Sequence, residues 1–314
     1  MKSAWAISSI WNRLGTKAVR GWKRDKYVYL MLLPVVAYYI IFKYLPMYGV
    51  IIAFKDFTPA QGFYDSPWVG FTWFKEFFES YYCWRIIRNT LLLNVYDVLF
   101  GFPAPIILAL LLNEITSKKF KSLAQTISYV PHFISVVVIA GMVINFTARD
   151  GLINNLITMA GGTPIPFMSS PNWFRAIYVG SGIWQSIGWG SIVYLAALTN
   201  VDPSLYEAAT VDGAGRWKQL IHITLPSILP TIVIMLILRL GTMMQVGYEK
   251  IILLYNPMIY ETADVISTFV YRKGLLQMNY SFSAAVDLFN SVINVILLIT
   301  VNQVCKKLRS TSLW

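Results

Sequence analysis

Six long apolar segments constrain the fold of this chain more than any other feature of its sequence. They occupy residues 27–45, 90–113, 126–146, 176–198, 228–248 and 284–303. Each is about 20 residues long, which is the length of helix that crosses the hydrocarbon core of a bilayer. With 56% hydrophobic and 13% charged residues among 314, the chain carries more apolar surface than one soluble core of this size can bury. We therefore predict an all-α membrane protein with six transmembrane helices.

Helices fit these segments better than membrane-spanning strands do. Strands of a membrane barrel alternate apolar and polar side chains over about ten residues. The run from Ile232 to Leu238 is apolar without interruption, which is the pattern of a lipid-embedded helix.

The distribution of Lys and Arg predicts that both termini face the cytoplasm, because cytoplasmic loops carry an excess of these residues. Residues 1–26, the loop after the second segment, the loop 199–226 and the tail 304–314 hold 15 of the 26. The loops on the other side hold ten. We expect a basic cytoplasmic segment at 1–26, a six-helix domain at 27–303 and a cytoplasmic tail at 304–314.

The net charge of +11 does not indicate nucleic-acid binding. The basic residues flank the apolar segments, where they set topology and contact the anionic headgroups of the lipid bilayer. The basic N-terminus followed by an apolar run also resembles a secretory signal. No small-residue cleavage site follows Phe42-Lys43-Tyr44, so we expect an uncleaved first span.

Sequence patterns of enzymes are missing. There is no Gly-Lys dipeptide and hence no phosphate-binding loop of the Walker type, and the two histidines form no His-Glu-x-x-His pair. No Gly-x-Ser-x-Gly elbow occurs either. We expect no catalytic residues, no metal site and no cofactor bound by this chain, so energy for any transport comes from another chain or from a gradient.

The loop 199–226, between the fourth and fifth segments, predicts two short helices joined by a sharp turn. Asp202 suits a helix N-cap and Pro203 a first helical position, so a helix should run from there to about Val211. Gly213 ends it, and a second short helix around 216–221 leads to Pro226, where the next membrane segment begins. By itself this pattern also fits an ordinary interfacial helix between two spans.

The spacing of residues within this loop resembles the cytoplasmic coupling loop of binding-protein-dependent ABC importers, whose permease subunits receive work from a separate ATPase. We assign these residues to ATPase coupling: Glu207, Ala208, Ala209, Asp212, Gly213, Ile223, Leu225 and Pro226. Residues 43–49 and 53–57, at the start of the outer loop 46–87, are similar to the first outer loop of permeases of the carbohydrate-uptake-1 group, more narrowly of its complex-oligosaccharide branch.

The resemblance implies a type I ABC importer permease in a bacterial cytoplasmic membrane. It implies a second related permease, two ATPase subunits that bind ATP and Mg, and an extracytoplasmic solute-binding protein that delivers an oligosaccharide. In this arrangement the coupling loop transmits force and the outer loops receive the binding protein. The aromatic residues of the outer loop suit either protein contact or anchoring at the membrane interface; they are Trp68, Phe71, Trp73, Phe74, Phe77 and Phe78.

Polar residues inside the segments are candidates for a substrate pathway, because ionisable groups in a membrane are costly and usually face a cavity or a partner. Sugars bind through hydrogen bonds and by stacking on aromatic rings. The candidates are Asn94, Asp97, Trp184, Gln185, Trp189, Arg239, Asp287, Asn290 and Asn294, with Ser181 and Gly188 on the helical face of Gln185. Bonding between helices for packing is the alternative. Arg239 either pairs with Asp97 or Asp287, or attracts a carboxylate of an acidic oligosaccharide.

Three other functions compete with a sugar importer permease. An ABC permease for a peptide or a polyamine would share the same coupling loop. A self-contained secondary transporter or channel would usually show paired halves with broken helices, and no such repeat is found. A membrane enzyme would need a nucleophile and base or a metal pattern, which the sequence lacks.

Overall fold

The computed structural model describes residues 25–241 and 247–309. Most of the basic segment 1–26 and the end of the tail 304–314 therefore lie outside the described residues. The regular secondary structure of the described part is helical, apart from one isolated antiparallel bridge between Lys55 and Trp68. It contains five helices long and apolar enough to cross a membrane, namely Asp25–Phe54, Cys83–Glu114, Val136–Met159, Arg216–Gly241 and Tyr280–Gln303. An all-helical membrane fold is thus confirmed.

The sixth predicted span, 176–198, lies within α10 (Pro171–Thr199), a helix of 29 residues. At about 1.5 Å per residue that length exceeds the hydrocarbon thickness of a bilayer. Its many Gly, Ser and Trp residues make it less apolar than the other five helices. The count of six spans and the placement of the termini stay predictions.

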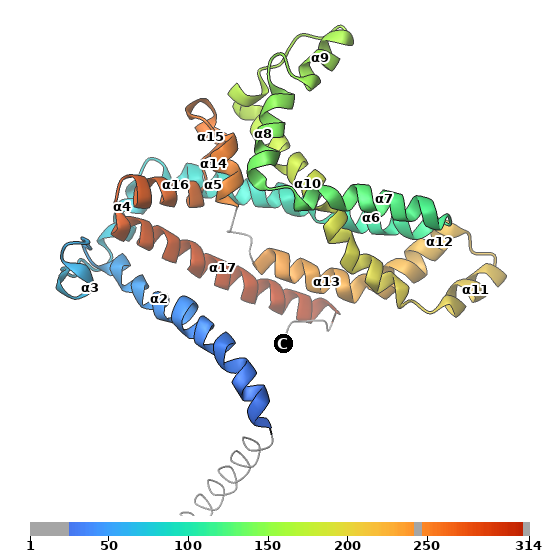
Figure 1. Cartoon of the computed structure of the whole chain (residues 1–314), viewed down its shortest axis with the longest axis horizontal. Helices are drawn as coiled ribbons and strands as arrows, with labels where there is room; N and C mark the ends of the chain where they lie inside the picture. Colours follow the sequence, from blue (N-terminus) through green and yellow to red (C-terminus); the bar gives the residue numbers. More distant parts are fainter. Residues whose placement is uncertain (1–24, 242–246, 310–314) are drawn as a thin grey trace, which may run out of the picture.

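The first part of the first span stands apart from the other helices (Figure 1), whereas its last turn, η2, packs against α17. Helix 25–39 continues through the π-helical turn η1 (Ile40–Tyr44), the short α2 (Leu45–Met47) and the 3-10 helix η2 (Tyr48–Phe54). None of its most apolar stretch is buried inside the chain. It also runs further than the predicted 27–45.

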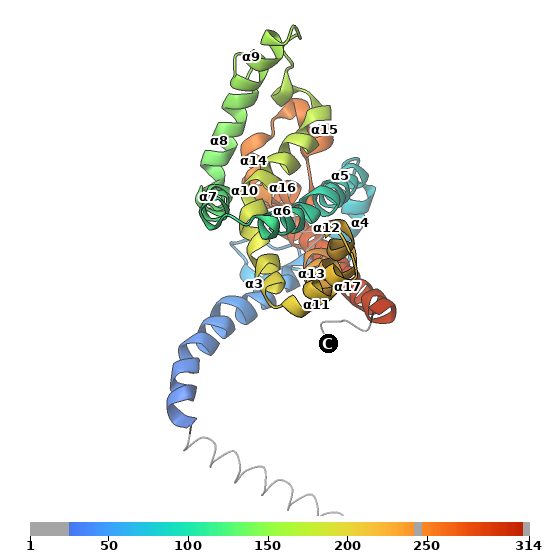
Figure 2. The same cartoon turned by 90° about the vertical axis from the view of Figure 1, so that its right-hand side faces the viewer.

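The second span is one continuous helix with a wider turn at its centre. It consists of α5 (Cys83–Tyr96), the π-helical turn η3 (Asp97–Gly101) and α6 (Pro103–Glu114). The carbonyl oxygen of Asp97 accepts the N–H of Phe102, five residues on. Helix α10 packs along α6 and η3, and the two views place α6 and α10 side by side (Figures 1 and 2).

The third predicted span, 126–146, is wrong as a continuous helix. It divides into the end of α7 (Lys118–Tyr129), the 3-10 turn η4 (Val130–Phe133) and α8 (Val136–Thr147). Ile134 is extended, and the Ser135 side chain accepts the N–H of Val138, which starts a new helix. Helix α8 packs against α14 and α10, and both views show α9 (Leu152–Met159) at its far end, on the same side of the molecule as α14 and α15 (Figures 1 and 2). A loop with η5 (Phe167–Ser169) then leads to α10.

The fifth span begins earlier than predicted. Helix α12 (Arg216–Gln219) continues through the π-helical turn η6 (Leu220–Thr224) into α13 (Leu225–Gly241). Pro226 therefore does not start a separate helix. The π-helical turn explains this, because Leu225 donates its N–H to the carbonyl oxygen of Leu220 and leaves the proline, which has no N–H, as the second residue of α13.

The segment after the fifth span is more regular than an ordinary outer loop. It forms α14 (Tyr248–Leu254), η7 (Pro257–Ile259), α15 (Tyr260–Ala263), α16 (Ile266–Tyr271) and the π-helical turn η8 (Arg272–Leu276) before α17 (Tyr280–Arg309). The fully buried Asp264 carboxylate accepts from Arg272 at 2.7 Å and from the Thr268 hydroxyl at 2.9 Å. Asn89 of α5 donates to the carbonyl oxygens of Glu261 and Asp264. These bonds hold the segment against the second span.

The aromatic residues of the outer loop 46–87 divide between two roles. Helices α3 (Gly62–Asp65) and α4 (Thr72–Glu79) lie in this loop, and α4 packs against α17. Phe77 is 1% exposed and joins a buried cluster with Phe282 and Ile86. Trp68 and Phe71 are instead 63% and 72% exposed, so they are available to lipid or to a partner.

Candidate functional site

The first candidate site is the coupling loop, which lies at one end of the helices (Figure 1). Helix α11 runs from Pro203 to Val211, which confirms the predicted bounds. The Asp202 carboxylate caps it by accepting the N–H of Ser204 at 2.9 Å. Hydrogen bonding to Ser204 lowers the pKa of Asp202, which favours the ionised form that caps the helix.

The turn after α11 is fixed by backbone geometry. Gly213 has a φ of +75°, in the left-handed region that favours glycine. Ala214 donates to the carbonyl oxygen of Ala209 at 2.8 Å, which satisfies one of the free carbonyls at the helix end. Gln219 of α12 donates to the Thr210 hydroxyl at 3.0 Å. The two helices and the turn therefore form one braced unit.

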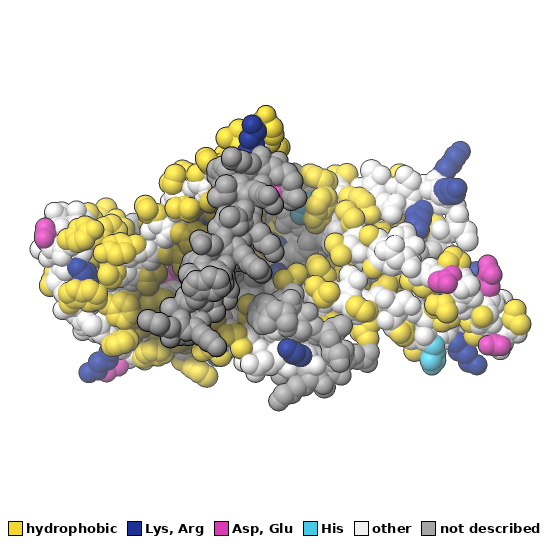
Figure 3. Space-filling model, turned by 90° about the horizontal axis from the view of Figure 1, so that it is seen from below, with side chains coloured by type: hydrophobic (Ala, Val, Ile, Leu, Met, Phe, Trp, Pro, Cys, Tyr) yellow, Lys and Arg dark blue, Asp and Glu magenta, His cyan; other side chains and the backbone are white. Residues whose placement is uncertain are grey.

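This unit exposes apolar side chains at the end of the molecule. Val211 is 88% exposed and Trp217 77% exposed, while Glu207 and Ala208 are also exposed. Asp212 is exposed as well, whereas Ala209, Ile223 and Leu225 are half-buried and Pro226 exposed. Seen from below, charged side chains gather at this end (Figure 3). These exposed apolar side chains make the end of the unit a candidate contact surface for another protein.

The second candidate site is a polar cavity of 250 Å³ between several helices. Its walls come from α5 and η3, from α10, from the end of α13 and from the start of α14. The lining residues are Leu93, Asn94, Asp97, Tyr178, Gly182, Gln185, Ser186, Arg239, Gly247 and Lys250. Four predicted pathway residues are thus brought together: Asn94, Asp97, Gln185 and Arg239. We call this space the polar cavity.

An ion pair crosses the polar cavity. The Arg239 guanidinium of α13 donates to the Asp97 carboxylate of η3, so of the two partners considered for Arg239 the structure selects Asp97. The Arg239 side chain is 48% exposed and that of Asp97 23%. The pair is therefore reachable from the cavity and partly screened by solvent.

Lys250 is a cavity residue that sequence reasoning missed. It is 8% exposed, and its ammonium donates to the carbonyl oxygen of Tyr178 at 3.0 Å and lies 5.0 Å from the centre of the Tyr178 ring. Lys250 lies in α14, beyond the end of the fifth span, and burial lowers its pKa to about 8. In the sequence, a lysine just after an apolar segment is typical of an ordinary loop, so no sequence pattern indicated that Lys250 lines a cavity.

Other predicted pathway residues lie elsewhere. Trp184 and Trp189 are 44% and 47% exposed, and Trp189 stacks on the His132 ring at 4.5 Å. Asp287 lines a separate cavity of 400 Å³. Asn290 and Asn294 are buried in α17 and do not line the polar cavity.

The helical face predicted for Gln185 is also partly wrong. Gly182 and Ser186 line the polar cavity beside Gln185. Ser181 instead bonds back to the carbonyl oxygen of Ile177 in its own helix, and Gly188 is buried.

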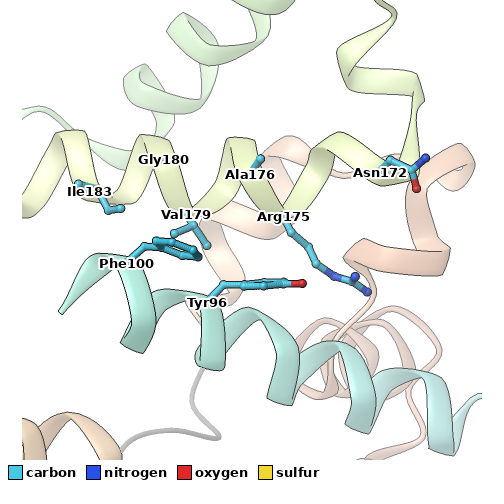
Figure 4. A pocket seen from close by; sticks show the side chains of 8 residues that line it. All are labelled: Tyr96, Phe100, Asn172, Arg175, Ala176, Val179, Gly180 and Ile183. Carbon is cyan, nitrogen blue, oxygen red and sulfur yellow. The ribbon is translucent and has the colours of Figure 1, made fainter. Parts of the chain in front are cut away.

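A larger cavity of 410 Å³ is lined by the neighbouring faces of α5, η3 and α10 (Figure 4). Tyr96 and Phe100 line it from the second span, and the Tyr96 hydroxyl lies toward Arg175. Arg175 donates to Asn89 at 3.1 Å. The π-helical turn thus directs Asp97 into the polar cavity, while its neighbours Tyr96 and Phe100 face this aromatic cavity.

Comparison with known proteins identifies a matching family and two similar relatives. The family described as "Binding-protein-dependent transport system inner membrane component" matches residues 101–309. Protein LplB of Bacillus subtilis (strain 168) is 49% identical over 286 residues, which cover 91% of this chain and 90% of LplB. The polygalacturonan/rhamnogalacturonan transport system permease protein YteP of the same organism is 44% identical, over 90% of this chain and 89% of YteP.

Two solved structures of ABC transporters are also similar to this chain. One is a bacterial ABC transporter involved in the import of the acidic polysaccharide alginate, with a TM-score of 0.87 and 44% identity, over 93% of this chain and 99% of the solved chain. Another is the bacterial alginate ABC transporter in complex with an alginate pentasaccharide-bound periplasmic protein, also with a TM-score of 0.87 and 44% identity, over 94% of this chain and 99% of that one.

Proposed function

Because this chain belongs to the family of binding-protein-dependent transport system inner membrane components, we propose that it is the permease subunit of an ATP-driven importer for acidic oligosaccharides. The chain is a multi-pass membrane protein and a transport subunit, not itself an enzyme. We further propose that its coupling loop faces the cytoplasm, together with both termini.

The charge of the polar cavity is the observation that supports an acidic substrate. Among its lining residues, one carboxylate faces two cations, Arg239 and Lys250. Carboxylate groups of a uronic acid chain would complement this excess, since charge-assisted hydrogen bonds are strong in a partly desolvated cavity. The polygalacturonan named for one relative and the alginate named for the solved transporters are both acidic, which supports the same assignment.

The proposed partners follow the importer arrangement. A second permease would complete the pathway, an extracytoplasmic solute-binding protein would deliver the oligosaccharide, and two cytoplasmic ATPase subunits would bind ATP and Mg²⁺. The exposed side chains around Glu207, Val211 and Trp217 would dock into a groove of an ATPase subunit as an amphipathic anchor. Closure of the ATPases would then move α11 and α12. Because α12 continues through η6 into α13, that motion would reach Arg239 along one helix.

Uptake by the reconstituted transporter tests this function. The chain is co-expressed with its genomic neighbours and placed in proteoliposomes with ATP inside and the binding protein outside. We expect ATP-dependent uptake of oligouronides, little uptake of neutral oligosaccharides of the same length, and none of peptides. Uptake of peptides would show that the substrate belongs to another class of solute. Uptake on a gradient without ATPase subunits would contradict the importer assignment altogether.

The lowered pKa of Lys250 predicts a pH dependence. The ammonium is present below about pH 8 and is lost as pH rises through that value, so its attraction for a carboxylate is lost in the same interval. We expect the uptake of an oligouronide, relative to its neutral methyl ester, to fall several-fold between about pH 7 and 9. Taking this ratio cancels the pH dependence of the ATPases.

Lys250→Arg is the matched control, because arginine keeps its charge throughout this range. Its uptake ratio should stay flat over the same pH interval. A wild-type ratio that is also flat, or an identical slope in both proteins, would show that the charge of Lys250 does not act on the substrate.

A further inference from the structure

The ion pair between Asp97 and Arg239 points to a role beyond holding two helices together. Asp97 lies on η3 and Arg239 on α13, 142 residues apart in the sequence. Both line the polar cavity, and the Arg239 side chain is nearly half exposed. A partly solvated pair of this kind contributes little net stability. A carboxylate of a ligand in the cavity can therefore compete with Asp97 for the guanidinium.

The local structure around Asp97 leaves room for its carboxylate. A side-chain carbon added at Gly101, one turn further along η3, would lie 2.8 Å from the Asp97 carboxylate oxygen. That distance is closer than a carbon and an oxygen can approach, so any larger residue would displace the carboxylate. The π-helical turn, which begins at Asp97, directs this residue toward Arg239. Turns of this type occur frequently at functional sites.

We propose that Asp97 is an internal competitor that occupies Arg239 when no substrate is bound and is displaced by a carboxylate of the acidic oligosaccharide. This inference rests on the proposed function. A neutral sugar offers no charge to replace Asp97 and leaves the ion pair in place. When the oligosaccharide moves on, Asp97 returns to Arg239, which lowers the affinity of the cavity and favours release. Asp97 thus determines specificity for acidic sugars and sets the rate of their release.

Two substitutions separate the charge of Asp97 from its position. Asp97→Asn removes the competing charge, and Gly101→Ala keeps the charge but displaces it. We expect each to lower the KM for an oligouronide about fivefold to tenfold and to lower kcat because release becomes slow. Uptake of the methyl-esterified oligosaccharide should not change. The measurements use the full transporter in proteoliposomes, with the binding protein fully loaded and its concentration varied, so that the KM refers to the loaded binding protein.

Phe100→Leu provides the matched control. Phe100 lies in the same π-helical turn but lines the aromatic cavity, not the polar cavity. Its KM for the oligouronide should equal that of the wild type. Asp97→Glu, which keeps a carboxylate, should preserve the wild-type ratio of acidic to esterified uptake.

The outcomes distinguish this inference from the function on which it rests. If the wild-type transporter takes up no oligouronide, the proposed function fails. If the wild type transports oligouronides but Asp97→Asn and Gly101→Ala share its KM and kcat, the inference fails alone. Loss of complex assembly in both variants would assign the ion pair a purely structural role and would also overturn it.

Discussion

Replacing Gly213 by valine is expected to reduce oligosaccharide uptake strongly while the transporter still assembles in the membrane. The φ of +75° at Gly213 costs an L-residue roughly 1–2 kcal/mol, and β-branched residues tolerate it least. Since no atom lies within 4 Å of the position a side-chain carbon would take, the penalty comes from the backbone alone. The turn would leave the left-handed region and re-aim α11 relative to α12.

The readouts are uptake and substrate-stimulated ATP hydrolysis in proteoliposomes. We expect uptake to fall at least about tenfold, with ATP hydrolysis no longer responding to the loaded binding protein. Gly213→Asn is the matched control, because asparagine tolerates the left-handed region, and it should retain most of the wild-type uptake. If the valine and asparagine variants transport equally well, the turn does not transmit force and the coupling assignment fails.

Removing the guanidinium of Arg239 is expected to have the second large effect. Arg239→Gln leaves Asp97 without its cation and the cavity with Lys250 as its remaining basic lining residue among those described. The variant also loses the charge-assisted hydrogen bond from Arg239 to a substrate carboxylate, and such bonds contribute about 1.5–3 kcal/mol. We expect the kcat/KM for an oligouronide to fall at least about thirtyfold.

A second variant separates binding from folding. Asp97→Asn combined with Arg239→Gln removes both charges, so no isolated ion remains in the cavity. This double variant should assemble as well as the wild type and still transport oligouronides poorly. Arg239→Lys keeps the charge but not the planar guanidinium, so its kcat/KM for an oligouronide should lie between those of the wild type and Arg239→Gln. Unchanged uptake by Arg239→Gln, with normal assembly, would remove Arg239 from the pathway.

The residues of the coupling loop illustrate what sequence predicts well. An N-cap aspartate, a first-position proline and a turn glycine each act through neighbours within a few residues, so the bounds of α11 could be read directly from the chain. The residues of the polar cavity illustrate the opposite. Helical spacing placed Gln185 with Ser181 and Gly188, whereas the structure places it with Gly182 and Ser186.

The sequence by itself determined the helical membrane class, the bounds of α11 and the polar residues worth testing, because length, hydropathy and capping are local properties. Only the tertiary structure decided that Arg239 pairs with Asp97 rather than Asp287 and that Lys250 completes the cavity. These contacts join residues 72 to 142 positions apart. The π-helical turns η3 and η6 each contain wider hydrogen-bonded rings than an α-helix, so the side chains after each turn face a different direction from the one that α-helical periodicity predicts.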